Sequence, residues 1–273
     1  MKWLFVAASM MCASAPAFAD VTFSGRMEQG GLVVGTTTPG ASITFNGAAV
    51  PVTADGHFLL GIGRDAPVMG ELVVTPAGGP PEKQKLSVAK RNWQIERVNG
   101  VPQKLVTPDP ELLAKIAAEN KLMYAAYMKL ELTPFFQTGF IRPAEGRVSG
   151  VFGSQRILNG TAMAPHSGYD IAAPIGTPIH AAADGVVSLQ RPDMIMTGNT
   201  IVLNHGYGLE TIYIHMGEIL VHDGQRVKQG DVIGKIGMTG RATGPHLHFG
   251  ATWFNTRLDP ETLLAVLPAK QAP

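Results

Sequence analysis

Short apolar segments divided by turn-forming dipeptides restrict the fold of this chain more than any other feature. Two such segments, Ser42–Phe45 and His57–Leu60, lie near its start. The dipeptides Asn46-Gly47 and Asp55-Gly56 stand between them. Asn-Gly and Asp-Gly pairs beside segments rich in branched and aromatic residues are typical of β-hairpins. The chain holds 32 glycines and 20 prolines in 273 residues, and we expect residues 20–93 to form a small β-sandwich.

The stretch from Pro39 to Phe58 is similar to the small immunoglobulin-like domains that accompany exported enzymes. This resemblance implies a β domain that carries no chemistry of its own. The partner of this domain is left open.

Residues 94–145 are predicted to form a linker built around one helix. Asp109 is a favourable N-cap, and Pro110 suits the first helical position. Apolar residues then recur at helical spacing, at Leu113, Ile116, Met123, Tyr127 and Leu130. This pattern predicts an amphipathic helix over about 110–131 whose apolar face docks on one of the domains. The pattern leaves open whether the helix also covers a functional site.

Beyond the linker the pattern returns to strands. Strand-like segments at 185–187, 200–203, 211–214 and 231–234 alternate with glycine-containing turns. No segment of helical length interrupts them, which favours an antiparallel sheet over a βαβ arrangement. We therefore expect residues 146–273 to form a second β domain, in a protein that is mainly β.

The first 19 residues have the character of a signal peptide. Lys2 precedes the apolar run Trp3–Met11, and Ala17-Phe18-Ala19 places small residues where a signal peptidase reads them, so cleavage is predicted before Asp20. The run is shorter than the roughly 20 residues of a membrane-spanning helix. A buried helix would leave the small-residue ending unexplained, and the residues before Cys12 fit a lipidation site poorly. The prediction is a soluble exported protein without a membrane anchor after cleavage.

Composition excludes several kinds of chemistry. Cys12 is the only cysteine, and it is lost with the signal peptide, so the mature chain has neither a disulfide framework nor a thiol nucleophile. A formal net charge of +1 gives no indication of a nucleic-acid partner. Seven of the 8 histidines fall between residues 166 and 248, which makes the later domain the place to look for catalysis.

Three groupings in that domain carry candidate ligands: His166 with Asp170, Tyr213 with His215, and His246 with His248. In an extended strand, His246 and His248 project from one face, roughly 6–7 Å apart. This spacing suits one ligand and one neighbouring base better than two ligands, although strand geometry permits both assignments. Tyr213 and His215 are expected to share a face by the same alternation. Asp170 can add a carboxylate oxygen.

Two imidazoles and one carboxylate form a ligand set of the kind that catalytic zinc sites use, with a fourth position open for water. Zinc lowers the pKa of that water to about 7 and polarises an amide carbonyl. Peptide hydrolysis also needs a proton acceptor and a group that stabilises the tetrahedral transition state, and His246 and His215 are the candidates. Histidines outside the groupings are read as structural, namely His57, His180, His205 and His222.

At these residues the sequence resembles the lysostaphin-type (LytM-type) zinc metallopeptidases. The matching segments run from Phe152 to about Trp253 and include Pro165–Ala172, Gly176–Ile179, Ala183–Val187, His205-Gly206, Tyr213–His215, Val227–Gly230 and Gly237–Phe249. The resemblance implies a β-sheet domain that hydrolyses peptide bonds of peptidoglycan. It makes His166, Asp170 and His248 the ligands of one Zn²⁺ per chain, and His215 and His246 the catalytic histidines. No His-Glu-x-x-His motif points to the helix-borne zinc peptidases.

The segment Val151–Arg156 and the pair Asn159-Gly160 resemble a subgroup from Gram-negative bacteria. Family substrates are glycine-rich cross-bridges or the D-alanyl to diaminopimelate cross-link, and this subgroup favours the latter and the periplasm. Arg156 could pair with a substrate carboxylate through its planar guanidinium, although a structural salt bridge explains it equally well. Tyr213 is a second candidate for substrate binding.

Two other functions compete with a zinc-dependent endopeptidase. Some relatives have lost ligands and act as catalytically silent regulators that activate cell-wall amidases, which the intact set of five residues disfavours here. A wall-binding module with a structural zinc would instead need a closed site of four ligands. The helix or the N-terminal domain could also hold the groove closed. A cell-wall protein that binds through the N-terminal domain is one expected partner.

Overall fold

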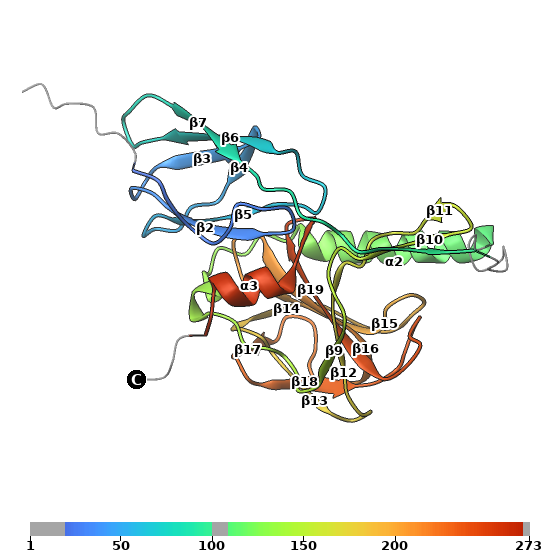
Figure 1. Ribbon diagram of the computed structural model, residues 1–273. Helices are drawn as coiled ribbons and strands as arrows, with labels where there is room; N and C mark the ends of the chain where they lie inside the picture. The colour runs from blue at the N-terminus through green and yellow to red at the C-terminus, as the bar shows by residue number, and fades with distance from the viewer. Residues whose placement is uncertain (1–19, 100–108, 270–273) are drawn as a thin grey trace, which may run out of the picture.

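The computed structural model describes residues 20–99 and 109–269 (Figure 1). The predicted signal peptide lies outside the described residues. The protein is mainly β and largely antiparallel, as the turn pattern predicted. Among the described residues, none of the helices combines the length and apolar character that crossing a membrane requires.

Residues 20–93, which we call the N-terminal unit, contain two antiparallel sheets. One sheet has the order β1-β2-β5 and contains Thr22–Ser24, Leu32–Thr36 and His57–Gly61. The other has the order β4-β3-β6-β7 and contains Ala48–Val50, Ser42–Phe45, Met69–Thr75 and Glu82–Ser87. Asn46 and Gly47 form the predicted turn with φ of 49° and 80°, the left-handed pair that a two-residue hairpin needs.

The segment that we expected to be a linker with one helix also contains a strand. Strand β8 (Ile95–Val98) pairs in parallel with β10 (Gln155–Leu158), and β10 pairs with β11 (Thr161–Ala162). Helix α2 (Pro110–Tyr127) begins at the predicted N-cap, where Asp109 accepts a hydrogen bond from the Leu112 N–H at 2.8 Å. No parallel pairing was expected here, because the sequence of β8 carries no mark of its partner.

Helix α2 is shorter than predicted and docks through one end. It stops at Tyr127, and its buried residues are Met123, Ala126 and Tyr127, whereas the expected contacts Leu113 and Leu130 are exposed. The buried end joins a small apolar cluster with residues of β14–β16. The helix therefore covers only part of the sheet face, and its first turns project past the sheet (Figure 1).

The C-terminal region is built on a large antiparallel sheet of order β17-β14-β15-β16-β19-β12-β9. These strands are Arg226–Val227, Gly185–Met194, Gly198–Asn204, Leu209–Ile219, His246–Trp253, Gly168–Ala172 and Arg147–Gly150. Strands β13 (Pro178–His180), β18 (Val232–Ile236) and β20 (Thr256–Leu258) extend it. A short 3₁₀ helix η1 (Phe135–Thr138) precedes the sheet, and helix α3 (Pro260–Val266) follows it.

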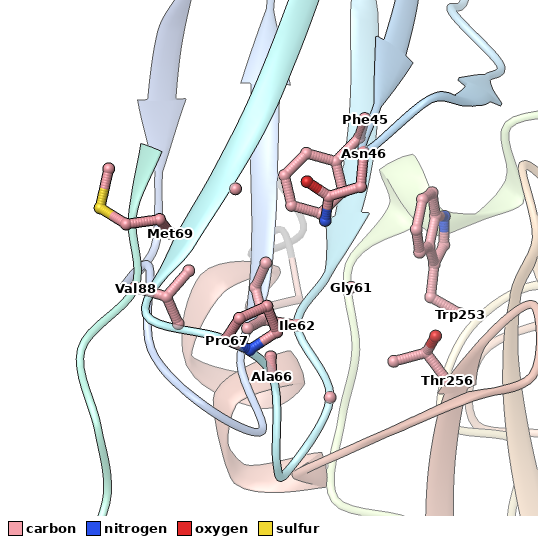
Figure 2. Close-up of a pocket in the computed structure, with 12 residues that line it drawn as sticks. Phe45, Asn46, Gly61, Ile62, Ala66, Pro67, Met69, Val88, Trp253 and Thr256 are labelled. Atoms are coloured by element: carbon pink, nitrogen blue, oxygen red, sulfur yellow. The ribbon is translucent and has the colours of Figure 1, made fainter. Parts of the chain in front are cut away.

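One continuous apolar core joins the N-terminal unit to the large sheet. A Cβ atom at Gly61 would lie 2.6 Å from Cβ of Trp253, so the two parts meet closely only because position 61 has no side chain. Beside this contact lies an open pocket of about 290 Å³, across which Trp253 and Thr256 face Phe45 (Figure 2). The division of the chain into separate domains stays a prediction.

Candidate active site

Asp170 and His248 face each other on neighbouring strands. Strands β12 and β19 pair antiparallel, which sets Asp170 opposite His248 and Ala172 opposite His246. Side chains two apart in a strand share a face, so His246 and His248 project together. Leu247 lies between them and is fully buried on the core side.

The ligand atoms of His166, Asp170 and His248 converge. Nε2 of His166 lies 3.1 Å from Oδ1 of Asp170 and 3.0 Å from Nδ1 of His248. Nδ1 of His248 lies 2.9 Å from the same Oδ1. Ligands at about 2.0–2.1 Å from a tetrahedral Zn²⁺ stand roughly 3.3 Å apart, so the three atoms need only a small expansion to hold such an ion. Two imidazole nitrogens and one carboxylate oxygen are ligands of the kind that zinc binds, so the residues present fit this ion.

Two glycines make room for this cluster. A Cβ atom at Gly150 would lie 2.4 Å from Oδ2 of Asp170, and one at Gly168 would lie 2.6 Å from Nε2 of His248. Neither position can carry a side chain without displacing a candidate ligand. The close packing of β9, β12 and β19 around the ligands therefore depends on both glycines.

Burial and hydrogen bonding set the charges in the cluster. Burial alone would raise the pKa of Asp170, but hydrogen bonds from His166 and His248 hold the pKa of this carboxyl far below its usual value. Burial lowers the pKa of His248, although Asp170 opposes it. Burial also acts to lower the pKa of His166, yet the hydrogen bond and charge of Asp170 raise it overall. An ionised carboxylate beside a neutral imidazole is the protonation state in which such residues bind a cation.

His215 joins the cluster through an uncommon backbone conformation. Its φ of 63° lies in the left-handed region, which residues other than glycine seldom adopt. Its backbone N–H donates to the Thr197 carbonyl, and its ring Nδ1–H donates to the Thr239 carbonyl, both at 2.8 Å. The ring centroid lies 4.8 Å from that of His246 and 6.2 Å from that of His248. Burial lowers the pKa of His215 to about 4, so the ring is neutral at pH 7.

The expectation that Tyr213 and His215 share a strand face is wrong. Ile214 pairs with His248 across β16 and β19, and both Ile214 and His215 line the same groove. The left-handed conformation at His215 interrupts the alternation of β16 and turns its ring toward the ligands.

Tyr213 points to the opposite side. Its side chain is fully buried against Phe249. Its hydroxyl accepts a hydrogen bond from the Ala182 N–H at 2.9 Å and lies 3.0 Å from Oγ1 of Thr211. A tyrosine held in the core in this way does not reach a substrate, so the structure contradicts its proposed role in substrate binding.

His246 completes the group. Its Nδ1 lies 2.8 Å from the Gly244 carbonyl, and its Nε2 lies 3.9 Å from Oδ1 of Asp170. A carbonyl only accepts hydrogen bonds, so Nδ1 of this ring carries the proton and Nε2 presents its lone pair to the cluster.

The five residues lie in a groove of about 1340 Å³. The edge strand β9 forms one side through Val148, and residues of β8 and β10 together with the segment 163–165 form another. The loops at 196–197 and 241–245 form a third side. An open groove of this shape can take an extended peptide across the candidate ligands.

Two arginines are candidates for binding a substrate carboxylate. Arg156 lies in β10, where its backbone pairs with Glu96, but its side chain lies outside what the structure describes, and its role stays a prediction. Arg241 was not among the predicted site residues. It lines the groove, is exposed, and has no ion pair within the described residues. Its position within the family-like segment Gly237–Phe249 was the signal that could have marked it.

Comparisons with known proteins agree with this geometry. The family model described as "Peptidase family M23" matches residues 164–260. The peptidoglycan DD-endopeptidase ShyA of Vibrio cholerae is 46% identical over 104 residues, which cover 38% of this chain and 24% of that protein. The DD-carboxypeptidase/endopeptidase Mpg of Neisseria meningitidis is 40% identical over 103 residues, with 38% and 24% covered. The matched part thus spans about a quarter of the length of these curated relatives.

A crystal structure assigned to peptidase M23 from Pseudomonas aeruginosa superimposes with a TM-score of 0.70 and 29% identity. The match covers 89% of this chain and 96% of that one, so it includes the N-terminal strands as well as the large sheet. In residues 164–260, this chain therefore carries a peptidase family M23 domain of the LytM type.

Proposed function

We propose that this protein is a zinc-dependent endopeptidase that hydrolyses peptide cross-links of peptidoglycan. The observation that carries the proposal is the convergence of His166, Asp170 and His248, whose ligand atoms lie 2.9–3.1 Å apart in an open groove. Similarity to relatives named as peptidoglycan DD-endopeptidases supports the substrate class.

His166, Asp170 and His248 would hold one Zn²⁺. When bound, the ion supplies Lewis-acid polarisation of the scissile carbonyl and makes water a stronger acid. The remaining chemistry belongs to two histidines that present Nε2 to the groove, because each donates Nδ1–H to a carbonyl, His215 to Thr239 and His246 to Gly244.

We assign proton transfer to His246. Its Nε2 accepts the proton of the attacking water and afterwards returns it to the leaving amine nitrogen. We assign stabilisation of the tetrahedral transition state to His215, whose Nε2 can donate a hydrogen bond to the oxyanion after it has taken up a proton from solvent in the groove. The two ring centroids lie 4.8 Å apart, close enough for both histidines to act on one scissile peptide bond.

The predicted signal peptide and the substrate class together support the periplasm of a Gram-negative bacterium as the place of action. A cross-link between D-alanine and diaminopimelate carries free carboxylates, and the exposed Arg241 on the groove is a cation suited to bind one. We therefore favour this cross-link over glycine-rich bridges.

The test uses the mature protein, purified sacculi that contain diaminopimelate, and analysis of the released muropeptides by mass spectrometry. We expect cross-linked dimers to be converted to monomers, chelator to abolish the conversion, and added Zn²⁺ to restore it. His246→Ala should lower the rate by about 10²–10⁴-fold. His222→Ala is the matched control, because this exposed histidine bonds only to its own loop.

An unchanged muropeptide profile from zinc-loaded protein, combined with stimulation of a cell-wall amidase, would identify the silent regulator instead. Hydrolysis that survives both the chelator and His246→Ala would rule out the proposed site.

A further inference from the structure

His166 depends on a loop for its position, unlike the other two candidate ligands. Asp170 and His248 lie within paired strands, whereas His166 lies in an irregular segment before β12. Three hydrogen bonds tie it to residues 151–154, which we call the support loop. Its ring Nδ1–H donates to the Val151 carbonyl at 3.0 Å, and its backbone N–H donates to the Ser154 carbonyl at 2.7 Å. Its own carbonyl accepts from the Gly153 N–H at 2.9 Å.

The bond to Val151 fixes the ring. Because a carbonyl can only accept, Nδ1 of His166 carries the proton and Nε2 is left to face the cluster. A partner that orients a ligand in this way influences metal affinity although it does not touch the metal. Whatever holds the support loop therefore acts on the candidate metal site.

The support loop is held by residues from outside the large sheet. Nε of Arg64, in the N-terminal unit, donates to the Gly153 carbonyl at 2.9 Å. Phe152 packs edge-to-face on Trp93, with ring centroids 5.8 Å apart. The guanidinium of Arg91 lies 4.6 Å and that of Arg64 lies 5.2 Å from the Trp93 ring.

This contact is buried and closely fitted. The Arg64 side chain is only 13% exposed, and Arg91 is anchored by an ion pair at 2.8 Å to the buried Asp259. A Cβ atom at Gly153, where φ is 78°, would lie 2.2 Å from the Trp93 ring. Only glycine permits this approach, so the indole and the support loop are matched in shape.

From these contacts we propose that the N-terminal unit positions the metal ligand His166, with Arg64 and Trp93 as the positioning residues. The inference rests on the proposed function, since it concerns the zinc that His166 would bind. It gives the N-terminal unit a role in the chemistry, namely to hold the support loop where the ring of His166 meets Asp170 and His248.

The test measures Zn²⁺ affinity of metal-stripped, full-length mature protein by competition with a chelating dye. Arg64→Ala should weaken binding by about tenfold, the lower range for the loss of a group that orients a ligand. Arg64→Lys keeps a donor that can reach the Gly153 carbonyl and should recover part of the loss. Arg26→Ala is the matched control, an exposed arginine of the same unit that makes no side-chain bond among the described residues.

Two further measurements separate positioning from loss of structure. The metal-free Arg64→Ala protein should unfold at nearly the same urea concentration as the wild type. Its visible spectrum with Co²⁺ should change, because the geometry at the metal has changed. Trp93→Phe, which keeps an aromatic contact with Phe152, should bind Zn²⁺ more tightly than Trp93→Ala.

Zn²⁺ affinity of Arg64→Ala equal to that of the wild type would overturn the proposal, as would an equal loss in Arg26→Ala. The affinity measurement does not depend on peptidoglycan. A wild-type protein that binds Zn²⁺ but leaves cross-links intact would therefore overturn the proposed function. It would not contradict the positioning role of Arg64 and Trp93.

Discussion

At the scale of single residues, the site contains one strained position. A non-glycine residue in the left-handed region costs on the order of 1–3 kcal/mol, and His215 adopts it with φ of 63°. Hydrogen bonds to the Thr197 and Thr239 carbonyls hold it there. The protein thus accepts local strain to bring a third imidazole beside His246 and His248.

Because of this strain, we expect a glycine at position 215 to give a more stable protein than an alanine, the reverse of the usual order. In metal-free protein, His215→Gly should be about 1 kcal/mol more stable than His215→Ala, because only glycine adopts the left-handed conformation without strain. At His246, which lies in a strand with ordinary backbone angles, His246→Gly should be the less stable by about 0.5–1 kcal/mol. Urea unfolding of the four variants measures both differences. The same order at both positions would contradict strain at His215.

Arg241 carries a prediction on specificity. If it binds a substrate carboxylate, Arg241→Gln should raise KM about tenfold with little change in kcat, as expected for the loss of one charge-assisted hydrogen bond. Steady-state kinetics would compare cross-linked peptides whose diaminopimelate carboxylate is free with peptides in which it is amidated.

The amidated peptide is the internal control for Arg241. With this peptide, the wild-type enzyme should already show the raised KM, and Arg241→Gln should raise it no further. Such non-additivity is expected when the arginine contacts the carboxylate directly. Arg191→Gln removes an exposed arginine that pairs with Asp223 away from the groove, and it should leave both substrates unaffected.

At the scale of elements, helix α2 reaches the active site through a turn. The Ile195 N–H, in the connection between β14 and β15, donates to both carboxylate oxygens of Glu119. Each N···O distance is 3.0 Å. Two residues on, the Thr197 carbonyl holds the backbone of His215. Helix α2 therefore holds the turn between β14 and β15, and that turn holds the backbone of His215.

We therefore expect Glu119→Ala to lower kcat by about tenfold, because a small displacement of a catalytic group is costly. Zn²⁺ content should not change, since no ligand lies on this turn. Glu119→Gln keeps an acceptor oxygen and should retain most activity. Glu111→Ala, in the same helix, removes only an exposed pair with Lys115 and serves as the control. Equal kcat values for Glu119→Ala and Glu111→Ala would contradict the link.

At the scale of the whole molecule, the pH dependence of stability should reflect one buried acid. Glu210 in β16 is fully buried; Asn204 donates to Oε1 at 3.2 Å, while Oε2 has no partner among the described residues. Burial raises its pKa to about 9, against the opposing charge of Arg257. Folded protein therefore keeps this proton at pH 7, whereas the unfolded chain has released it near its ordinary pKa of 4.5.

This difference in bound protons determines the direction in which stability changes with pH. Between pH 4.5 and about 9 the folded state binds one proton more than the unfolded state, so stability falls as pH rises, by about 1.4 kcal/mol per pH unit. The stability is fully present below pH 4.5 and is lost as the pH rises through the folded pKa. Urea unfolding at pH 7.0 and 8.5 should show a loss of about 2 kcal/mol.

Glu210→Gln keeps an oxygen acceptor and removes the titration, so its stability should be nearly constant over that interval. His215 does not contribute to this measurement above pH 7 in metal-free protein, because burial lowers its pKa to about 4. The pKa of His166 is raised, and the slope that this residue adds is the same in the wild type and in Glu210→Gln. A slope in Glu210→Gln as steep as that of the wild type would assign the effect to another group.

Sequence alone determined what depends on local chemistry. The Asn46-Gly47 turn, the N-cap at Asp109 and the mainly β fold follow from preferences within a few residues, and the structure confirms them. The grouping of His166, Asp170 and His248 rested on motif spacing, and the structure brings these residues together, while their roles stay proposals.

Tertiary structure decided what depends on distant partners. Alternation in the sequence put Tyr213 and His215 on one face, but carbonyls from Thr197 and Thr239 turn His215 over. The early end of α2 and the pairing of β8 with β10 likewise depend on what lies beside those segments. A local sequence pattern reflects the average conformational preference of a segment. The conformation of His215, the end of α2 and the partner of β8 depend instead on hydrogen bonds and contacts between residues far apart in the chain.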